Sequence, residues 1–144
     1  MPPTLVTHLS PWIPGSLPIL PQYEPPARAG FPSPAEDYTE KRIDLNHQLI
    51  KHPAATFLIR VVGDSMTGAG IHSGDVLVVD RSERPRPGQV VVAALNSELI
   101  VKRIPLAGKK PQLLSENPSH AHLQVDELAD LKIWGVVKHV IHSL

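Results

Sequence analysis

The amino-acid sequence predicts a mainly β domain with a short helical segment and an extended N-terminal arm. From Thr56 onward, short segments rich in valine, isoleucine and leucine alternate with turn residues, a pattern typical of β-strands. Ten of the 16 prolines lie in residues 1–34, so the two parts of the chain differ in character. With 144 residues and 42% hydrophobic content, the chain is long enough for one domain with a core. Because only 4% of the residues are aromatic, aliphatic side chains are expected to fill that core.

The N-terminal residues 1–30 are interpreted as an extended, mobile arm. Their prolines remove backbone donors and restrict φ, which argues against a stable helix or a central strand. Apolar side chains such as Leu5, Trp12 and Tyr23 could still dock on a surface. We therefore expect two regions, the arm at 1–30 and a β-rich domain at 31–144.

Two short helices are expected between the arm and the first strand. Ser33-Pro34-Ala35-Glu36 combines a capping serine, proline at the first helical position and glutamate at the third, which is a capping-box pattern. Residues 44–50 resemble a second short helix, which ends before Pro53 because a residue that precedes proline disfavours the helical conformation.

The strands that follow are separated by residues typical of turns, such as Ser73-Gly74-Asp75 and Pro87-Gly88. The third and fourth strands are joined through Asn96-Ser97-Glu98, which predicts a hairpin. The expected strands are Phe57–Val62, Val76–Asp80, Gln89–Leu95, Leu99–Ile104, Gln112–Ser115 and Lys132–Ile141.

Composition excludes several kinds of function. Lys+Arg and Asp+Glu both number 14, so no global charge draws the protein to nucleic acid, and little direct DNA binding is expected. The chain has no cysteine, which rules out disulfide and thiolate chemistry. No stretch approaches the roughly 20 apolar residues of a membrane helix, and no basic segment typical of a signal peptide precedes Ile13–Leu20. A cytoplasmic protein is expected.

Lys102 is placed where a lysine is chemically unusual. In a strand, alternate residues share a face, so Lys102 lies with Ile100 and Ile104, while Arg103 points the other way. An ammonium on an apolar face loses hydration, and its pKa falls. A neutral lysine can take the proton of a serine hydroxyl, and Ser65 in Gly63-Asp64-Ser65-Met66 is the candidate. Taken singly, the two residues have ordinary interpretations, a turn serine and a solvent-exposed strand lysine.

Three segments in this order resemble the LexA/UmuD group of self-cleaving serine–lysine peptidases: Gly63–Asp80 (GDSMTGAGIHSGDVLVVD), Gly88–Ala94 and Leu99–Arg103. Residues 30–38 and 42–46 resemble the UmuD-like members, which are subunits of error-prone DNA polymerase V. The resemblance implies a small, curved β fold of the LexA and signal-peptidase type. It implies Ser65 as nucleophile and Lys102 as general base, cutting the chain's own Ala29–Gly30 bond and removing the arm. The small side chain of alanine suits a narrow cleft, and the glycine after it lets the backbone bend into that cleft.

The resemblance also implies partners. Cleavage after DNA damage would be activated by a RecA–single-stranded-DNA filament. The processed chain, a homodimer through residues 31–144, would then join a Y-family polymerase subunit in translesion synthesis. No cofactor, metal or membrane enters this scheme.

Other function classes fit the sequence less well. A repressor needs an N-terminal DNA-binding domain, which a proline-rich arm cannot supply. A signal-peptidase-like protease acting on other proteins needs a membrane anchor, which is not expected here. A non-enzymatic, β-rich protein-interaction domain stays open as the alternative.

Histidines offer two further chemistries. A Ser–His–acid triad with His72 and Asp75 is disfavoured, because Thr67 replaces the second glycine of G-x-S-x-G. His120-x-His122 and His139-x-x-His142 could pair at a metal, but no cysteine or clear carboxylate completes a four-ligand zinc site. Exposed histidines are therefore expected.

Overall fold

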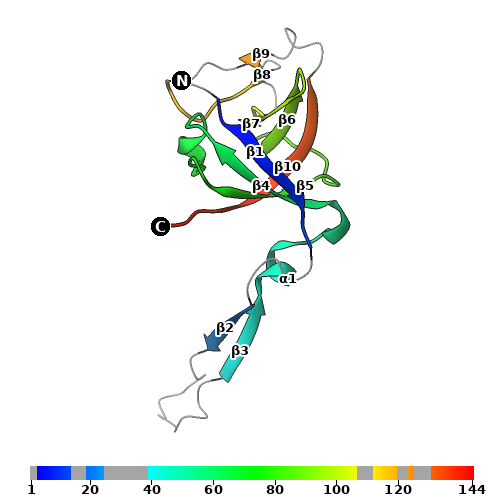
Figure 1. The fold of residues 1–144 in the computed structure, drawn as a ribbon, viewed down its shortest axis with the longest axis vertical. Coiled ribbons are helices and arrows are strands. Elements are labelled where there is room, and N and C mark those ends of the chain that lie inside the picture. The colour runs from blue at the N-terminus through cyan, green and yellow to red at the C-terminus, as the bar shows by residue number, and fades with distance from the viewer. Residues whose placement is uncertain (1–2, 14–18, 25–38, 107–111, 120–122, 125–130) are drawn as a thin grey trace. The chain divides into compact units, whose positions relative to one another are not determined.

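The computed structural model describes residues 3–13, 19–24, 39–106, 112–119, 123–124 and 131–144. The chain divides into two compact units (Figure 1). One unit comprises Met1–Trp12 together with His52–Leu144, and the other comprises Ile13–Lys51.

The larger unit is a closed barrel of antiparallel strands in the order β1-β4-β5-β10-β6-β7 (Figure 1). Closure removes the unpaired strand edges that an open sheet would expose. The predicted mainly β, small and curved fold is confirmed. The strands are β1 (Leu5–Pro11), β4 (Thr56–Val62), β5 (Val76–Asp80), β6 (Val90–Leu95), β7 (Glu98–Arg103) and β10 (Lys132–Ile141).

Short elements connect the barrel strands. A 3-10 turn, Pro53–Ala55, precedes β4, and another, Thr67–Ala69, follows the serine motif. The pair β8 (Gln112–Leu113) and β9 (Leu123–Gln124) forms a small second sheet, and an isolated bridge joins Leu114 to Arg103. The strand expected at Gln112–Ser115 is therefore shorter than predicted.

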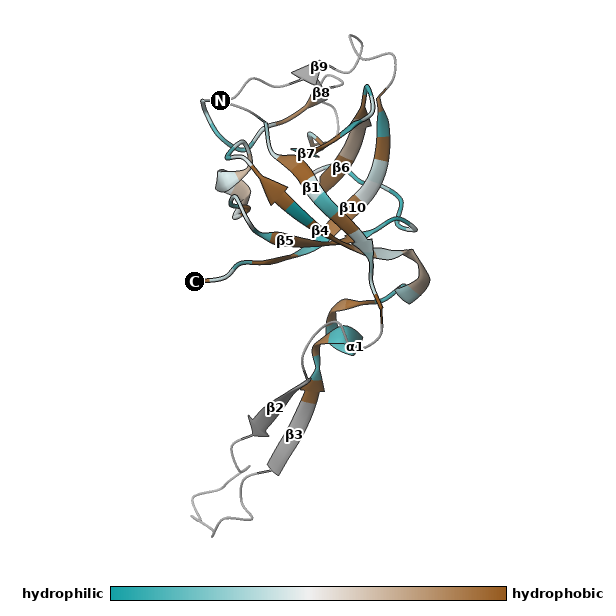
Figure 2. Cartoon of the chain, in the orientation of Figure 1, coloured by the Kyte–Doolittle hydropathy of each residue, from teal (hydrophilic) through white to brown (hydrophobic). Residues whose placement is uncertain are grey.

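Aliphatic side chains from β4, β5, β6 and β7 and from the segment between β4 and β5 form the core of the barrel. Hydrophobic positions recur along the barrel strands in Figure 2 (brown). In β4, Ile59 and Val61 are fully buried, whereas Arg60 and Val62 between and after them are exposed, as alternation requires. The aromatic residues whose burial is known, Trp12, Phe57 and Trp134, are only half-buried, which agrees with the predicted aliphatic core. Its buried members are Ile59, Val61, Met66, Ile71, Leu77, Val79, Val92 and Val101.

The predicted hairpin is β6–β7, and its register places Lys102. Asn96 and Ser97 have φ values of 48° and 70°, which fit the two-residue turn that follows the twist of a hairpin. Pairing runs from Leu95↔Glu98 to Val90↔Arg103. Lys102 thereby lies opposite Val91 in the middle of the barrel wall.

The strand β1 differs from the expectation of an arm without a central strand. It pairs with β4 along its length, from Leu5↔Val62 to Pro11↔Phe57, and with β7 at Leu5↔Ile100. The physical reason is that residues 4–10 contain no proline, so every donor within the strand is present, and Pro11 stands at its end. Removal of residues 1–30 by cleavage stays a prediction.

The smaller unit contains a two-stranded sheet and one helix. Strand β2 (Ile19–Glu24) pairs antiparallel with β3 (Thr39–Asp44). Strand β2 lies in the segment expected to lack a helix and a central strand, and it agrees with that expectation, because each strand of a two-stranded sheet is an edge, where proline is tolerated. Helix α1 (Leu45–Leu49) confirms the second predicted helix, and Asp44 caps it by accepting the Asn46 N–H at 2.9 Å. The helix expected at Ser33–Glu36 lies outside the described residues.

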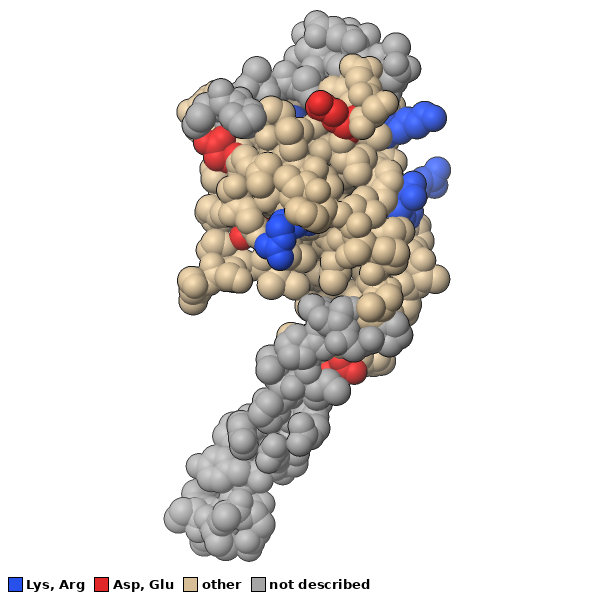
Figure 3. Space-filling model, viewed as in Figure 1, with Lys and Arg blue, Asp and Glu red and all other residues tan. Residues whose placement is uncertain are grey.

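Within the described part of the chain, no helix combines the length and the apolar character needed to cross a membrane. On the face in Figure 3, the described Lys and Arg side chains stand apart from one another and do not form one basic patch.

Candidate functional site

Ser65 lies in the loop that follows β4, with its side chain fully buried. The next residue, Met66, is also fully buried and belongs to the barrel core, which anchors the loop. Gly63 has a φ of +108°, and a Cβ there would lie 2.5 Å from the Pro3 carbonyl oxygen. Glycine at this position therefore permits both the left-handed backbone and the close approach of Pro3.

Lys102 is buried on β7, with 3% of its surface exposed. Ile100 and Ile104, which share its face by alternation, belong to a second apolar cluster with Ala93 and Leu113, whereas Val101 points into the barrel core. Burial of the ammonium lowers the pKa of Lys102 below its ordinary value. The burial predicted for Lys102 and the direction of its pKa shift are confirmed.

A short segment, residues 114–117, connects the serine loop to the lysine strand. Leu114 exchanges two backbone hydrogen bonds with Arg103, the residue after Lys102, and the Glu116 N–H donates to the Ser65 carbonyl at 2.8 Å. The Asn117 amide donates to the Asp64 carbonyl at 2.8 Å. Ser65 and Lys102, distant in sequence, are thus held by neighbouring residues of one segment.

Arg103 strengthens this connection from the other face of β7. Its Nε lies 2.6 Å from Glu116 Oε1, and its Nη1 donates to the Gly88 carbonyl at 2.6 Å. Since both ion-pair partners are about one-third exposed, the pair contributes chiefly to position, because a partly exposed ion pair adds little stability.

The two candidate groups have different hydrogen-bond partners. Ser65 Oγ donates to Thr4 Oγ1 and accepts from the Thr4 N–H, both at 2.8 Å. Lys102 Nζ donates to Ser115 Oγ at 2.5 Å. Within the described residues, no hydrogen bond joins Ser65 directly to Lys102, and the Ser65 N–H donates to no other group.

Sequence reasoning missed Thr4 and Ser115. Both are buried, at 0% and 5% exposure, yet neither belongs to a recognisable motif. Thr4 falls within the predicted arm, and Ser115 is expected only as the end of a strand. Their role follows from strand pairing across long stretches of sequence, and no local pattern signals it.

The Ala29–Gly30 pair, expected to be the scissile bond, lies outside the described residues. His120 and His122 lie outside them as well.

The histidines group differently from the sequence pairs. Asp75, which is 2% exposed, lies 2.5 Å from His142 Nδ1 and accepts the His72 N–H at 2.7 Å. Burial by itself raises the pKa of Asp75, but the hydrogen bonds from His142 and from the His72 N–H, with the charge of the two imidazoles, lower it below its ordinary value. Ser65 contacts neither histidine through a hydrogen bond, so the geometry does not form a triad. Among the described residues, two groups of three side chains of the kinds that bind metals lie close together. One is His72, Asp75 and His142, and the other is His52, Asp80 and Glu83. His139 belongs to neither group.

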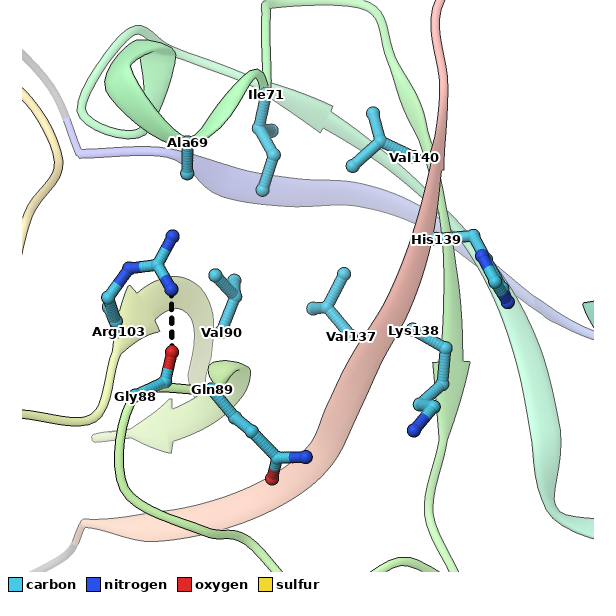
Figure 4. Close-up of a pocket in the computed structure, with 10 residues that line it drawn as sticks. All are labelled: Ala69, Ile71, Gly88, Gln89, Val90, Arg103, Val137, Lys138, His139 and Val140. Carbon is cyan, nitrogen blue, oxygen red and sulfur yellow. Dashed lines mark hydrogen bonds between the residues drawn. The ribbon is translucent and has the colours of Figure 1, made fainter. Parts of the chain in front are cut away.

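A pocket of about 280 Å³ opens beside the serine loop (Figure 4). Ala69 and Ile71 line one side, and Arg103 reaches in from β7 to hydrogen-bond the Gly88 carbonyl. Neither Ser65 nor Lys102 lines this pocket. The remaining lining residues are Gln89, Val90, Val137, Lys138, His139 and Val140.

Comparison with known proteins identifies the family. The Peptidase S24-like family matches residues 21–138, which include the serine motif, the lysine strand and the connecting segment. The chain belongs to the Peptidase S24-like family. The resemblance to the LexA/UmuD group is thereby confirmed, and with it membership of a family of serine peptidases.

Relatives within the Peptidase S24-like family cover most of the chain. Protein SamA of Salmonella typhimurium is 50% identical over 117 residues, which are 80% of this chain and 79% of SamA. Protein ImpA of Escherichia coli is 44% identical over 126 residues, 86% of this chain and 84% of ImpA. The LexA repressor of Ectopseudomonas mendocina is 42% identical over 114 residues, 78% of this chain but 55% of the repressor.

Proposed function

We propose that this protein is a self-cleaving serine peptidase in which Ser65 attacks the Ala29–Gly30 bond and Lys102 is the general base. The observation that carries the proposal is the buried Lys102 amine, tied to the serine loop through residues 114–117. Its one hydrogen-bond partner in the described residues is the neutral hydroxyl of Ser115. Since no carboxylate pairs with it there, the uncharged amine is favoured.

The chemistry follows from that neutral amine. Lys102 takes the proton of Ser65 Oγ as the oxygen bonds to the Ala29 carbonyl carbon, forming a tetrahedral intermediate. The Ser65 N–H, which donates to no other described group, is suited to stabilise the oxyanion. The C–N bond then breaks, and protonated Lys102 gives its proton to the Gly30 amine. Water, deprotonated by Lys102, hydrolyses the ester on Ser65 and restores both side chains.

The test is incubation of the purified protein at a pH near 10, where a lysine loses its proton most readily. Intact mass is compared for the wild type, Ser65→Ala, Lys102→Ala and Lys138→Ala. Lys138 is the matched control because its amine is ion-paired with Glu83 on another part of the barrel. We expect fragments that break between Ala29 and Gly30 in the wild type and in Lys138→Ala only. Cleavage retained in Lys102→Ala would remove that residue from the mechanism.

We also propose the setting in which cleavage matters. Residues 1–30 are removed after DNA damage, with a RecA–single-stranded-DNA filament as activator, and residues 31–144 form a cytoplasmic homodimer that serves a Y-family translesion polymerase. Support comes from the resemblance to UmuD-like subunits and from the high identity to SamA and ImpA over about four-fifths of each chain. The formal net charge of zero favours partners recognised through protein contacts.

This setting is tested by mixing the full-length and shortened proteins separately with the Y-family subunit of the same source. Co-elution on size exclusion is expected for at least one form. If neither form binds, the polymerase role fails. If the wild type stays intact even with an activated RecA filament, the non-enzymatic interaction domain becomes the better description.

A further inference from the structure

Pro3 and Thr4 lie against the proposed nucleophile, in a space beside Ser65 and Gly63 that we call the slot. Thr4 is fully buried. Its N–H and its hydroxyl oxygen both bind Ser65 Oγ at 2.8 Å, and its carbonyl accepts the Val101 N–H of β7 at 3.0 Å. The residue next to Lys102 therefore helps to hold a segment of backbone on top of Ser65.

Gly63 lets peptide backbone lie in this slot. A Cβ at Gly63 would lie 2.5 Å from the Pro3 oxygen and 2.9 Å from the Thr4 Cα, so the absence of a side chain at 63 is what lets the backbone enter. The polar contacts are to backbone groups and to one small side chain. The position beside Ser65 is thus filled by main chain and one small side chain. Alanine at position 29 is also small, although it lacks the hydroxyl of Thr4.

Thr4 and a substrate carbonyl cannot occupy the slot together. A reacting carbonyl carbon must come within about 3–3.5 Å of the nucleophile, and Thr4 N and Oγ1 already lie at 2.8 Å. In addition, the Ser65 proton is donated to Thr4 Oγ1 and not toward Lys102. Thr4 itself is not attacked in this arrangement, because its N–H faces Ser65 while its carbonyl is bonded to Val101.

We propose that residues 3–11 are an internal competitor of the scissile segment: Pro3 and Thr4 fill the peptide slot, β1 anchors them, and they must leave before Ala29–Gly30 can reach Ser65. This inference rests on the proposed self-cleavage. Two features limit how firmly β1 is held. Residues 7–11 of β1 are exposed, so its apolar contacts come from Leu5 and Val6, and its register with β7 is the single pair Leu5↔Ile100. Segments with few buried apolar contacts open at low free-energy cost.

The decisive experiment is a reversible lock on β1. The chain has no cysteine, and His8 and Arg60 are exposed partners in the β1–β4 register, so His8→Cys/Arg60→Cys can join the two strands. The control is Arg60→Cys/Val76→Cys, which uses the same position on β4 but joins it to β5 and leaves β1 free. Cleavage of each full-length variant is followed by intact mass near pH 10, oxidised and after reduction with a phosphine.

We expect the oxidised β1–β4 variant to cleave roughly tenfold or more slowly than its reduced form, because the lock lowers the population of the open state. The β4–β5 control should cleave equally in both states. Equal cleavage of the oxidised and reduced β1–β4 variant would overturn the inference while leaving self-cleavage intact. If the wild type does not cleave at all, the proposed function fails, and the inference fails with it.

Thr4→Val gives a second test that does not depend on the disulfide. Valine keeps the shape of threonine but removes the oxygen that accepts the Ser65 proton. A self-cleavage rate of Thr4→Val above that of the wild type supports the inference. This holds even if the β1–β4 cysteine variant fails to cleave in its reduced form because its structure is disturbed. A rate equal to or below wild type contradicts the inference.

Discussion

Ser115→Ala tests whether the hydroxyl beside Lys102 sets the chemistry of the lysine or only fills space. Lys102 is 3% exposed and Ser115 is 5% exposed, and Lys102 Nζ donates to Ser115 Oγ at 2.5 Å. Nζ donates this hydrogen bond in its charged and neutral forms alike. A hydrogen bond to a charged group contributes about 1.5–3 kcal/mol, and a neutral one about 0.5–1.5 kcal/mol.

Loss of Ser115 therefore destabilises the charged amine more, by about 1–1.5 kcal/mol. At 1.36 kcal/mol per pH unit, the midpoint of the cleavage rate against pH should move down by about one pH unit. The plateau rate at high pH should fall about two- to tenfold, since the neutral amine also loses the bond that orients it. A residue with a purely structural role would change the stability and the plateau but not the midpoint.

The assay is the self-cleavage rate, measured by intact mass from pH 7 to pH 11 for the wild type, Ser115→Ala, Ser115→Thr and Ser119→Ala. Ser119 is an exposed serine near the same segment, and its substitution should leave the profile unchanged. Ser115→Thr keeps a hydroxyl and should restore the wild-type midpoint. A midpoint that stays in place or moves to higher pH in Ser115→Ala would refute the reasoning.

Three further predictions concern the barrel. Because the folded pKa of Asp75 is lowered, its carboxylate stabilises the fold above its unfolded pKa of about 3.9, and this contribution is lost as the pH falls through the folded pKa. Urea unfolding from pH 6 to pH 2.5 should show this loss of stability, and Asp75→Asn should make the stability depend less on pH. Leu77→Ala should lower the free energy of unfolding by about 2–5 kcal/mol because Leu77 is fully buried. Leu106→Ala, at an exposed site, should change it by less than about 0.5 kcal/mol. Equal effects of the two substitutions would contradict the assigned core. Ser97→Gly should raise the free energy of unfolding by about 0.5–1 kcal/mol, since Ser97 has a φ of 70° where glycine is unstrained; a loss of stability in urea melts would show that the turn is misassigned.

The barrel strands were predictable where local pattern and final environment agree. Val76–Asp80 and Lys132–Ile141 have the predicted bounds, because runs of valine and isoleucine between turn residues suit only a strand with a buried face. Lys102 was predictable for the same reason. Alternation within one strand is enough to place it with Ile100 and Ile104, and nothing beyond that strand is needed.

The N-terminal strand shows where local reasoning fails. Proline counts over residues 1–30 describe an average, whereas strand formation at Leu5–Pro11 depends on the proline-free residues within it and on the partner strands β4 and β7. Its register partners lie 46 to 57 positions away on β4 (57 − 11 and 62 − 5) and 95 positions away on β7 (100 − 5). The grouping of His142 with Asp75 depends in the same way on the register of β10 against β5.

The sequence by itself determined the fold class, the family and the two residues proposed for catalysis, since each rests on a motif or a periodicity within a short stretch. Only the tertiary structure decided what surrounds those residues. Thr4 over Ser65, Ser115 beside Lys102 and the segment that links them come together through backbone pairing between distant strands. Such contacts follow from closing the barrel, which brings β1 and β7 side by side, and no local preference along the chain encodes that closure.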